Sequence, residues 1–330
     1  MPQGEVLVTF MGFDAGGART GARLRDAGLR VVLAPKNGAR DAEEVARLAA
    51  GSVAAIVSTD PFDRGVFRAA PALRVIARVG VGTDSIDLAA ATEAGVVVTT
   101  TPGANRETAA DHALAMMLAA LRRVVEHDAS VRRGEWRRGG DLTPWDLHGT
   151  TVGLIGYGGI GRAVGRRVAG FGAHVLACDP AEPGTVALDE LLERADVVSL
   201  HLPLTDATRG IVGAAELARM AAHAVLVNTS RGGLVDEPAL VEALRSGGIR
   251  AAALDVFADE PRLPAGMAGL PNVVLTPHIG GLSERSIARM TERATDHVLA
   301  VLGGRPDRES VANPEVLESP LLRARLASRA

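Results

Sequence analysis

The sequence predicts an α/β fold with two doubly wound domains, each built around a parallel sheet. Short apolar runs alternate with segments of helical periodicity along most of the 330 residues. This alternation is typical of parallel strands that helices cover on both faces. It starts again near residue 151, and a chain of this length is expected to form about two domains.

The two series of apolar runs give the expected strands. In the first third of the chain they cover residues 5–10, 30–33, 54–58, 75–78 and 95–99, with helices that include 21–28 and 42–50. In the second series they cover residues 151–155, 174–179, 197–202, 224–228, 251–256 and 273–276. The helices expected between these are 160–171, 188–193, 215–221 and 237–246. The strand runs are short and bounded by turn residues, which favours strands over helices.

Two longer segments have helical spacing of apolar residues. The first, from residue 107 to about 126, follows a turn cluster at 101–105 and is expected to link the two domains as one helix. The second, 283–301, follows the last strand. Its simplest use is to cross back and pack on the first domain, which would then be discontinuous in sequence. The tail from residue 303 is rich in Arg and Pro and is expected to be partly irregular.

Composition and charge exclude several classes of protein. Hydrophobic residues make up 47% and charged residues 23%, as in ordinary globular domains. The 36 basic and 39 acidic residues nearly cancel, which disfavours a nucleic-acid or membrane binder. Cys178 is the only cysteine, so neither an intrachain disulfide nor a multi-cysteine metal site is expected. With no basic leader and no long apolar run, we expect a cytoplasmic protein without a metal.

A glycine-rich turn follows the expected strand 151–155. Residues Gly156, Gly158 and Gly161 form a G-x-G-x-x-G pattern that opens a helix, with Gly159 and Ile160 inside it. Such a turn lets a pyrophosphate approach the backbone at the positive end of the helix. The strand–turn–helix context favours a dinucleotide site over a plain connecting turn.

An acidic residue stands where a ribose would be bound. Asp179 ends the next strand, 18 residues after Gly161, close to the spacing of an acid that binds ribose hydroxyls. Residues 179–184 contain no Arg or Lys to meet a 2′-phosphate. The sequence therefore favours NAD over NADP.

Three polar residues at or after later strand ends suit the chemistry of 2-hydroxy acids. Arg231 can hold a carboxylate through two hydrogen bonds. His278 can donate a proton to a carbonyl oxygen and accept it in reverse, and Glu260 can orient its imidazole. Each residue alone could equally be structural: a strand-end histidine, a surface ion pair or a solvated loop acid.

Taken together, the motifs resemble a known family. The segments that match begin at Arg78 (RVGVGTD), Thr101 (TPGAN), Gly156 (GYGGIG), His201 (HLPLT), Asn228 (NTSRGGLVD), Leu254 (LDVF) and Thr276 (TPH). From about residue 74 to 311 the chain is similar to the D-isomer-specific 2-hydroxyacid dehydrogenases, in particular the branch of phosphoglycerate dehydrogenases. It resembles a short form without the C-terminal serine-sensing domain, so no inhibition by serine is expected.

The resemblance implies roles for individual residues. It implies that Arg231 binds the carboxylate and carbonyl groups of the substrate. It further implies that Glu260 tunes the pKa of the imidazole and that His278 transfers the proton. It assigns cofactor binding to Gly156, Gly158, Gly159, Ile160, Gly161, Asp179, His201, Pro203, Thr229, Asp255 and His278, with Asp255 at the nicotinamide amide. It assigns substrate binding to Arg78, Val79, Gly80, Val81, Gly82, Asn105 and Arg231, with backbone N–H groups of 79–82 meeting the substrate carboxylate.

The resemblance also implies an architecture. We expect a flavodoxin-like substrate domain at 1–103 and 285–330, and a Rossmann NAD-binding domain at 104–284. The active site would lie in a cleft between them that closes on binding. Homodimers are usual in the family, so a homodimer is expected.

The substrate is less well defined than the reaction. D-3-phosphoglycerate is the first candidate, with Arg78 and Arg106 as possible partners of its phosphate or as plain surface residues. The phosphoglycerate enzymes often have a small residue where Arg106 stands, so glyoxylate, hydroxypyruvate or another 2-oxo acid is the alternative. Two further interpretations are a relative of formate and phosphonate dehydrogenases, which the Glu260–His278 arrangement fits less well, and an NADH-sensing interaction protein like the corepressors of this family.

Overall fold

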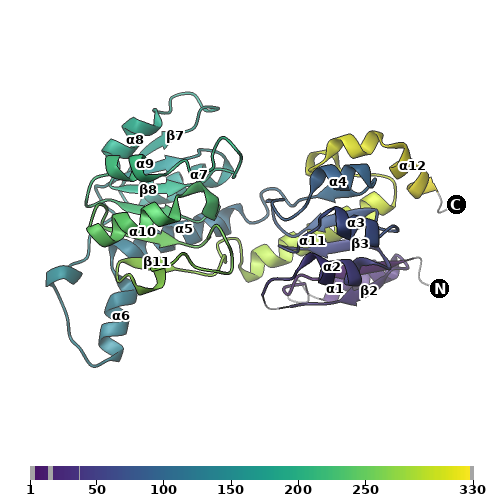
Figure 1. Cartoon of the computed structure of the whole chain (residues 1–330), viewed down its shortest axis with the longest axis horizontal. Helices are drawn as coiled ribbons and strands as arrows, with labels where there is room; N and C mark the ends of the chain where they lie inside the picture. Colours follow the sequence, from purple (N-terminus) through teal and green to yellow (C-terminus); the bar gives the residue numbers. More distant parts are fainter. Residues whose placement is uncertain (1–3, 14–17, 37, 328–330) are drawn as a thin grey trace. The chain divides into compact units, whose positions relative to one another are not determined.

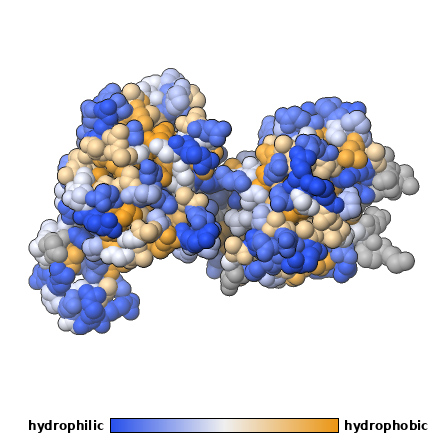
Figure 2. Space-filling model, viewed as in Figure 1, coloured by the Kyte–Doolittle hydropathy of each residue, from blue (hydrophilic) through white to orange (hydrophobic). Residues whose placement is uncertain are grey.

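The computed structural model describes residues 4–13, 18–36 and 38–327. The chain divides into two compact units, here called unit 1 (Met1–Asn105 and Leu282–Ala330) and unit 2 (Arg106–Gly281) (Figure 1). The chain therefore leaves unit 1 once and returns to it once. On the visible face of each unit, hydrophilic residues surround small exposed apolar areas (Figure 2).

Unit 1 contains a five-stranded sheet in the order β2-β1-β3-β4-β5, with every neighbouring pair parallel. This is the flavodoxin-like order. Its strands are β1 (Glu5–Val8), β2 (Arg30–Leu33), β3 (Ser52–Val57), β4 (Val75–Arg78) and β5 (Val97–Thr99). Its helices are α1 (Ala18–Asp26), α2 (Ala42–Ala49), α3 (Arg64–Ala69), α4 (Leu88–Glu93), α11 (Glu284–Leu302) and α12 (Pro320–Ala327), with 3-10 turns at Arg308–Ser310 and Pro314–Glu318.

Unit 2 contains a six-stranded parallel sheet in the order β11-β10-β9-β8-β6-β7. Its strands are β6 (Thr151–Ile155), β7 (His174–Cys178), β8 (Val197–Leu200), β9 (Val225–Asn228), β10 (Ala251–Leu254) and β11 (Val273–Leu275). Its helices are α5 (Arg106–Leu121), α6 (Val124–Arg132), α7 (Gly159–Gly170), α8 (Leu188–Arg194), α9 (Ala214–Arg219) and α10 (Glu237–Ser246), with 3-10 turns at Gly140–Leu142, Gly232–Leu234 and Met267–Gly269. The predicted α/β fold with two parallel sheets is confirmed.

The central strands of each sheet are buried on both faces, which explains why they are apolar at nearly every position, whereas the edge strands β2 and β7 are partly exposed. In β9, Val225 and Val227 pack with helices α5 and α7, whereas Leu226 packs on the other face with α8, α9 and α10. Alternate residues of a strand point to opposite faces, so a strand between two helix layers needs apolar residues at every position. Burying one such side chain contributes about 1.5–3 kcal/mol relative to leaving it exposed.

The single helix expected at 107–126 is wrong. Helix α5 ends at Leu121, and α6 begins at Val124. Arg123 between them has φ 52°, in the left-handed region that a continuing helix cannot use. Its guanidinium lies 3.0 Å from the carboxylate of Glu126, which holds the new helix start.

The second long helix, α11, packs against β3, β4 and α1 of unit 1. Arg289 Nε of this helix donates to the carbonyl oxygen of Ala104 at 2.9 Å. The tail after it is partly irregular, as expected, with two 3-10 turns before helix α12. Among the described residues, no helix combines the length and the apolar character needed to cross a membrane.

Candidate active site

The expected site residues of unit 2 follow the carboxyl ends of its six parallel strands. These residues are Gly156 after β6, Asp179 after β7, His201 after β8, Thr229 after β9, Asp255 after β10 and His278 in the loop after β11. Parallel strands place these ends at one edge of the sheet. The strand order reverses between β6 and β8, which is the point where open α/β sheets bind ligands.

The glycine turn after β6 has the backbone that a pyrophosphate cradle needs. Gly156 has φ 91°, and a Cβ there would lie 2.6 Å from the carbonyl oxygen of His201. A Cβ at Gly161 would lie 2.2 Å from the carbonyl oxygen of Gly156. Neither position can therefore hold a side chain without moving the backbone. At Gly158 a Cβ would meet no atom within 4 Å, so this face of the turn is open to a ligand.

The first turn of α7 suits an anion. Gly158 is its N-cap, no side chain caps it, and it contains no acidic residue. Its first N–H groups, including those of Gly159 and Ile160, therefore point their positive ends outward. Arg106 adds a cation, because its Nε would lie 2.8 Å from a Cβ at Gly159. These residues fit a dinucleotide pyrophosphate.

The other expected cofactor residues are partly engaged within the protein. The carboxylate of Asp179 accepts hydrogen bonds from the N–H groups of Tyr157 (2.8 Å) and Ala181 (3.0 Å), and each oxygen keeps a lone pair for a ribose hydroxyl. His201 Nε2 lies 3.0 Å from Ser199 Oγ, and burial lowers the pKa of His201 to about 4, so its imidazole is neutral near pH 7.

Two further expected cofactor residues lie on neighbouring loops. Pro203 is exposed and Thr229 is half-buried. Their positions after β8 and β9 are consistent with contact to a bound cofactor, which stays a prediction.

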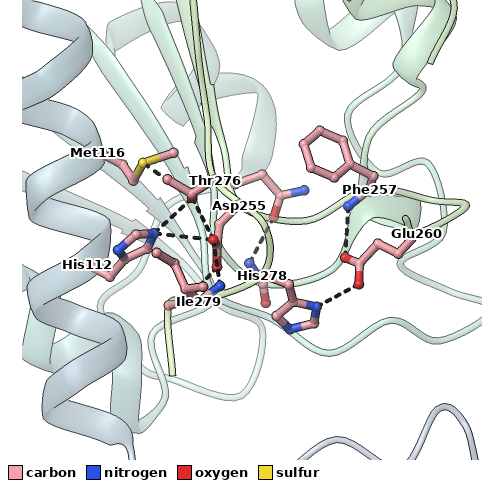
Figure 3. Close-up of polar contacts among 11 residues, drawn as sticks. His112, Met116, Asp255, Phe257, Glu260, Thr276, His278 and Ile279 are labelled. Carbon is pink, nitrogen blue, oxygen red and sulfur yellow. Dashed lines mark hydrogen bonds and ion pairs between the residues drawn. The ribbon is translucent and has the colours of Figure 1, made fainter. Parts of the chain in front are cut away.

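Glu260 and His278 are in direct contact. Nδ1 of His278 lies 2.8 Å from Oε2 of Glu260, and Oε1 of Glu260 accepts the N–H of Phe257 at 3.1 Å (Figure 3). Burial alone would raise the pKa of the Glu260 carboxyl, but the hydrogen bond and charge of His278 outweigh it, so the pKa lies below its usual value. An ionised carboxylate only accepts hydrogen bonds, so Nδ1 of His278 carries a proton.

His278 is held in an uncommon backbone conformation. Its φ is 55°, which costs a non-glycine residue roughly 1–3 kcal/mol and persists only where the surroundings enforce it. Its N–H donates to the carbonyl oxygen of Asp255 at 2.8 Å. The side chain itself is 36% exposed, so the imidazole lies partly at the surface.

Asp255 lies beneath this segment and is fully buried. Its carboxylate accepts hydrogen bonds from Thr276 Oγ1 (2.6 Å) and from the N–H groups of Ile279 (2.9 Å) and Gly280 (2.7 Å). Burial alone would raise its pKa, but these bonds and that of His112 keep the pKa below its usual value. Its contacts support a structural role for the His278 segment. The expected contact with the nicotinamide amide stays a prediction, since the side chain has no exposed surface in this structure.

Arg231 stands on the loop after the neighbouring strand β9. Asn228 shapes this loop by donating to the carbonyl oxygen of Arg231 at 2.8 Å and accepting the N–H of Ser230 at 3.1 Å. The guanidinium donates to the carbonyl oxygen of Ser230 at 2.7 Å. The next residue, Gly232, packs on the backbone of Phe257, whose N–H binds Glu260. The Arg231 loop thus rests on the Glu260 loop.

The expected substrate residues 78–82 and 105 belong to unit 1. Two of the four proposed backbone donors are already used: the N–H of Val79 donates to Val57 O (2.7 Å) and that of Gly80 to Thr101 Oγ1 (3.0 Å). Of the four backbone N–H groups expected to meet the substrate carboxylate, those of Val81 and Gly82 therefore remain candidates. Arg78 Nη1 donates to the carbonyl oxygen of Val79 at 3.2 Å. The side chain of Asn105 is half-buried at the end of unit 1.

One residue of the network was not expected from the sequence. His112 of α5 lies 3.1 Å from Thr276 Oγ1 and 3.3 Å from Asp255 Oδ1, through Nε2 (Figure 3). Its only sequence signal is a polar residue among the buried positions Ala109, Ala113 and Met116 of an apolar helix. In the described part of the chain, no cluster of three or more His, Cys, Asp or Glu could hold a metal ion.

Comparison with known proteins shows the family. Residues 114–280 match the model of the NAD-binding domain of D-isomer-specific 2-hydroxyacid dehydrogenases. A glyoxylate reductase of Korarchaeum cryptofilum is 45% identical over 74% of this chain and 78% of its own length. A D-3-phosphoglycerate dehydrogenase of Mycobacterium leprae is 43% identical over 77% of this chain, which spans 50% of that relative's length. A crystal structure of a Thermus thermophilus protein superposes with a TM-score of 0.85 at 41% identity, covering 93% of this chain and 99% of that one.

The chain belongs to the D-isomer-specific 2-hydroxyacid dehydrogenase family, whose members are NAD-dependent oxidoreductases that act on CH–OH groups. The resemblance inferred from the sequence motifs is thereby confirmed.

Proposed function

We propose that the chain interconverts a D-2-hydroxy acid and the corresponding 2-oxo acid, with His278 as the proton-transfer residue. The contact between His278 Nδ1 and Glu260 Oε2 is the observation that carries this proposal. A histidine whose one ring nitrogen is fixed by a carboxylate presents the other to substrate in a defined orientation.

The protonation states follow from the contacts. Glu260 is ionised and holds the Nδ1 proton, so Nε2 of His278 is the atom that exchanges a proton with substrate. In reduction, Nε2–H donates to the carbonyl oxygen of the 2-oxo acid. In oxidation, the neutral ring accepts the proton of the hydroxyl group. NADH, when bound, supplies the hydride.

Arg231 is proposed to hold the substrate carboxylate and to polarise the carbonyl group. A guanidinium offers two parallel N–H donors that match a carboxylate. Its loop rests on the loop of Glu260, which supports a common site for the three residues.

D-3-phosphoglycerate is the first candidate substrate, supported by the M. leprae relative. Glyoxylate or hydroxypyruvate is the second candidate. It is favoured by the glyoxylate reductase, because the match covers 78% of that relative's length, against 50% for the M. leprae relative. Measuring kcat/KM for NADH oxidation with phosphohydroxypyruvate, hydroxypyruvate and glyoxylate decides between them. A preference of about tenfold or more for one compound identifies it, and turnover of none, with NADH binding intact, would contradict the proposal.

We also propose that NAD is preferred to NADP. Asp179 places a carboxylate directly after β7, and the nearby guanidinium of Arg162 is paired with Glu182. A 2′-phosphate about 4 Å from one carboxylate would be repelled by about 4 kcal/mol at an effective dielectric constant of 20. The test is kcat/KM with NADH against NADPH, and equal values would contradict the preference.

A homodimer is the third part of the proposal. Helix α6 stands away from the layers of unit 2 (Figure 1), and it and the following segment expose Val124, Val125, Val131 and Trp136, the last by 80%. Exposed apolar side chains gathered on one element are typical of an interface. Light scattering after gel filtration should give the mass of two chains, and Trp136→Arg should shift the protein toward one chain. A single-chain mass for the wild type would contradict this part.

A further inference from the structure

Asp255 is a fully buried carboxylate that depends on its neighbours for hydrogen bonds. A carboxylate with no exposed surface is stable only if hydrogen bonds replace the water that it has lost. Three of its partners are Thr276 Oγ1 and the N–H groups of Ile279 and Gly280. All three lie in segment 276–280, which carries His278. They would therefore move together with His278 and cannot by themselves fix its position.

The fourth partner comes from another element. His112 projects from helix α5, and its Nε2 lies 3.3 Å from Asp255 Oδ1 and 3.1 Å from Thr276 Oγ1 (Figure 3). The Thr276 hydroxyl has one proton, and it donates this proton in the 2.6 Å hydrogen bond to Asp255 Oδ1. Thr276 Oγ1 and Asp255 Oδ1 are therefore both acceptors toward the ring, and Nε2 of His112 carries a proton that it shares between them.

The His112 ring also closes the space around Gly280. A Cβ at Gly280 would lie 2.8 Å from Asp255 Oδ2 and 3.3 Å from Cδ2 of His112. The backbone of Gly280 is thus packed against the carboxylate and close to the ring. Helix α5 is itself fixed in the core of unit 2 through Ala110, Ala113 and Met117, all fully buried. It gives the network an anchor outside segment 276–280.

We propose that His112 is a positioning residue for His278: it anchors Asp255 and Thr276 to helix α5, and so fixes the segment that presents the imidazole to substrate. The proposal rests on the role of His278 proposed above. It follows from the geometry, because His278 keeps its φ of 55° while its N–H is bonded to Asp255 and its ring to Glu260. Without His112, the Asp255 carboxylate loses its hydrogen bond to helix α5, and its remaining side-chain partners all lie within segment 276–280.

Three variants of His112 test this. His112→Leu keeps an apolar side chain of moderate size but removes the donor, and it should lower kcat by about 10- to 100-fold, as expected when a reacting group is misplaced by up to about 1 Å. KM for the 2-oxo acid and the Kd of NADH should stay within about twofold. His112→Gln, whose Nε2–H group can donate in place of the ring, should recover most of the lost kcat. His112→Glu, which places a second carboxylate beside Asp255, should not.

A matched control is His127→Leu. His127 of helix α6 also binds one acceptor of unit 2 through Nε2, the carbonyl oxygen of Leu142 at 3.1 Å, but takes no part in this network. It should leave kcat unchanged. Equal activity of His112→Leu and wild type, or equal losses in the Gln and Leu variants, would overturn the proposal.

A readout without turnover separates this proposal from the proposed function. The Cε1–H resonance of His278, assigned with His278→Ala, should shift or broaden in His112→Leu and stay in place in His112→Gln and His127→Leu. If the wild type reduces no 2-oxo acid, the proposed function fails, while the resonance still reports whether His112 positions His278. An unchanged His278 resonance in His112→Leu would overturn the inference itself.

Discussion

The carboxylate of Glu260 lies 2.8 Å from the ring of His278, although the two residues stand on separate loops after neighbouring strands. Glu260 fixes the ring through Nδ1, and Asp255 fixes the backbone of the same residue. Two acids from one strand end and its following loop thus determine where one imidazole points.

Replacing Arg231 by Lys should impair catalysis nearly as much as replacing it by Ala. A charge-assisted hydrogen bond contributes about 1.5–3 kcal/mol, so loss of the paired donors should lower kcat/KM by at least about tenfold in both variants. The measurement is steady-state kinetics with the preferred 2-oxo acid. Full activity of Arg231→Lys would show that a point charge is sufficient.

Gly161→Ala should abolish measurable NADH binding. Its Cβ would lie 2.2 Å from the carbonyl oxygen of Gly156, so the turn would have to open. Gly170→Ala, at the end of the same helix, is the matched control, because a Cβ there would meet no atom within 4 Å. It should bind NADH normally and gain up to about 1 kcal/mol of stability from better helix propensity. Fluorescence titration with NADH and thermal melts provide the comparison.

Arg106→Gln should weaken the binding of the phosphate-bearing half of the cofactor. Its guanidinium lies against Gly159 at the start of α7, where it can neutralise a pyrophosphate. We expect the Kd of ADP-ribose to rise by roughly fivefold to tenfold, and that of adenosine to stay the same. Calorimetry with both ligands measures this. If ADP-ribose binding is unchanged and KM for the 2-oxo acid rises instead, Arg106 belongs to the substrate.

The stability of the protein should fall in acid partly through Glu260. Its pKa is lowered in the folded state from the ordinary value of 4.5, so its ionised form stabilises the fold above that value. This contribution is lost as the pH falls from about 4.5 through the lowered native pKa. Melting temperatures of wild type and Glu260→Gln between about pH 6 and pH 3 should therefore converge at low pH. Parallel curves would mean that Glu260 does not contribute in this way.

Much of the fold could be predicted because its strands are short apolar runs, and the central ones are buried on both faces. Strands 30–33, 75–78 and 151–155 have the expected bounds, and others overrun at the carboxyl end, such as 251–256 against Ala251–Leu254. The reason is physical: Val256 stays buried after the ladder has ended, so its apolar character does not mark the end of the strand. The break between α5 and α6 could not be predicted, because no Gly or Pro stands there. Arg123 has a left-handed backbone conformation, which arginine rarely adopts and which the sequence does not indicate.

The site residues could be named from motifs, but their contacts could not. The residue types after the strand ends suggested Glu260 and His278 as partners, and the structure shows the hydrogen bond between them. The sequence could not show that the side chain of Asp255 is buried, or that the N–H groups of Val79 and Gly80 already donate hydrogen bonds within the protein. It gave no reason to select His112, because contact with Asp255 depends on the packing of α5 against a strand end more than a hundred residues away.

The most direct test is the reaction of His278→Gln. Reduction of 2-oxo acids by NADH should fall by about 10²- to 10⁴-fold, the usual contribution of a positioned general acid, while the Kd of NADH stays within about twofold. His174→Gln, which changes an exposed histidine of β7, should behave as wild type. Turnover of His278→Gln at the wild-type rate would contradict the role of the His278–Glu260 pair.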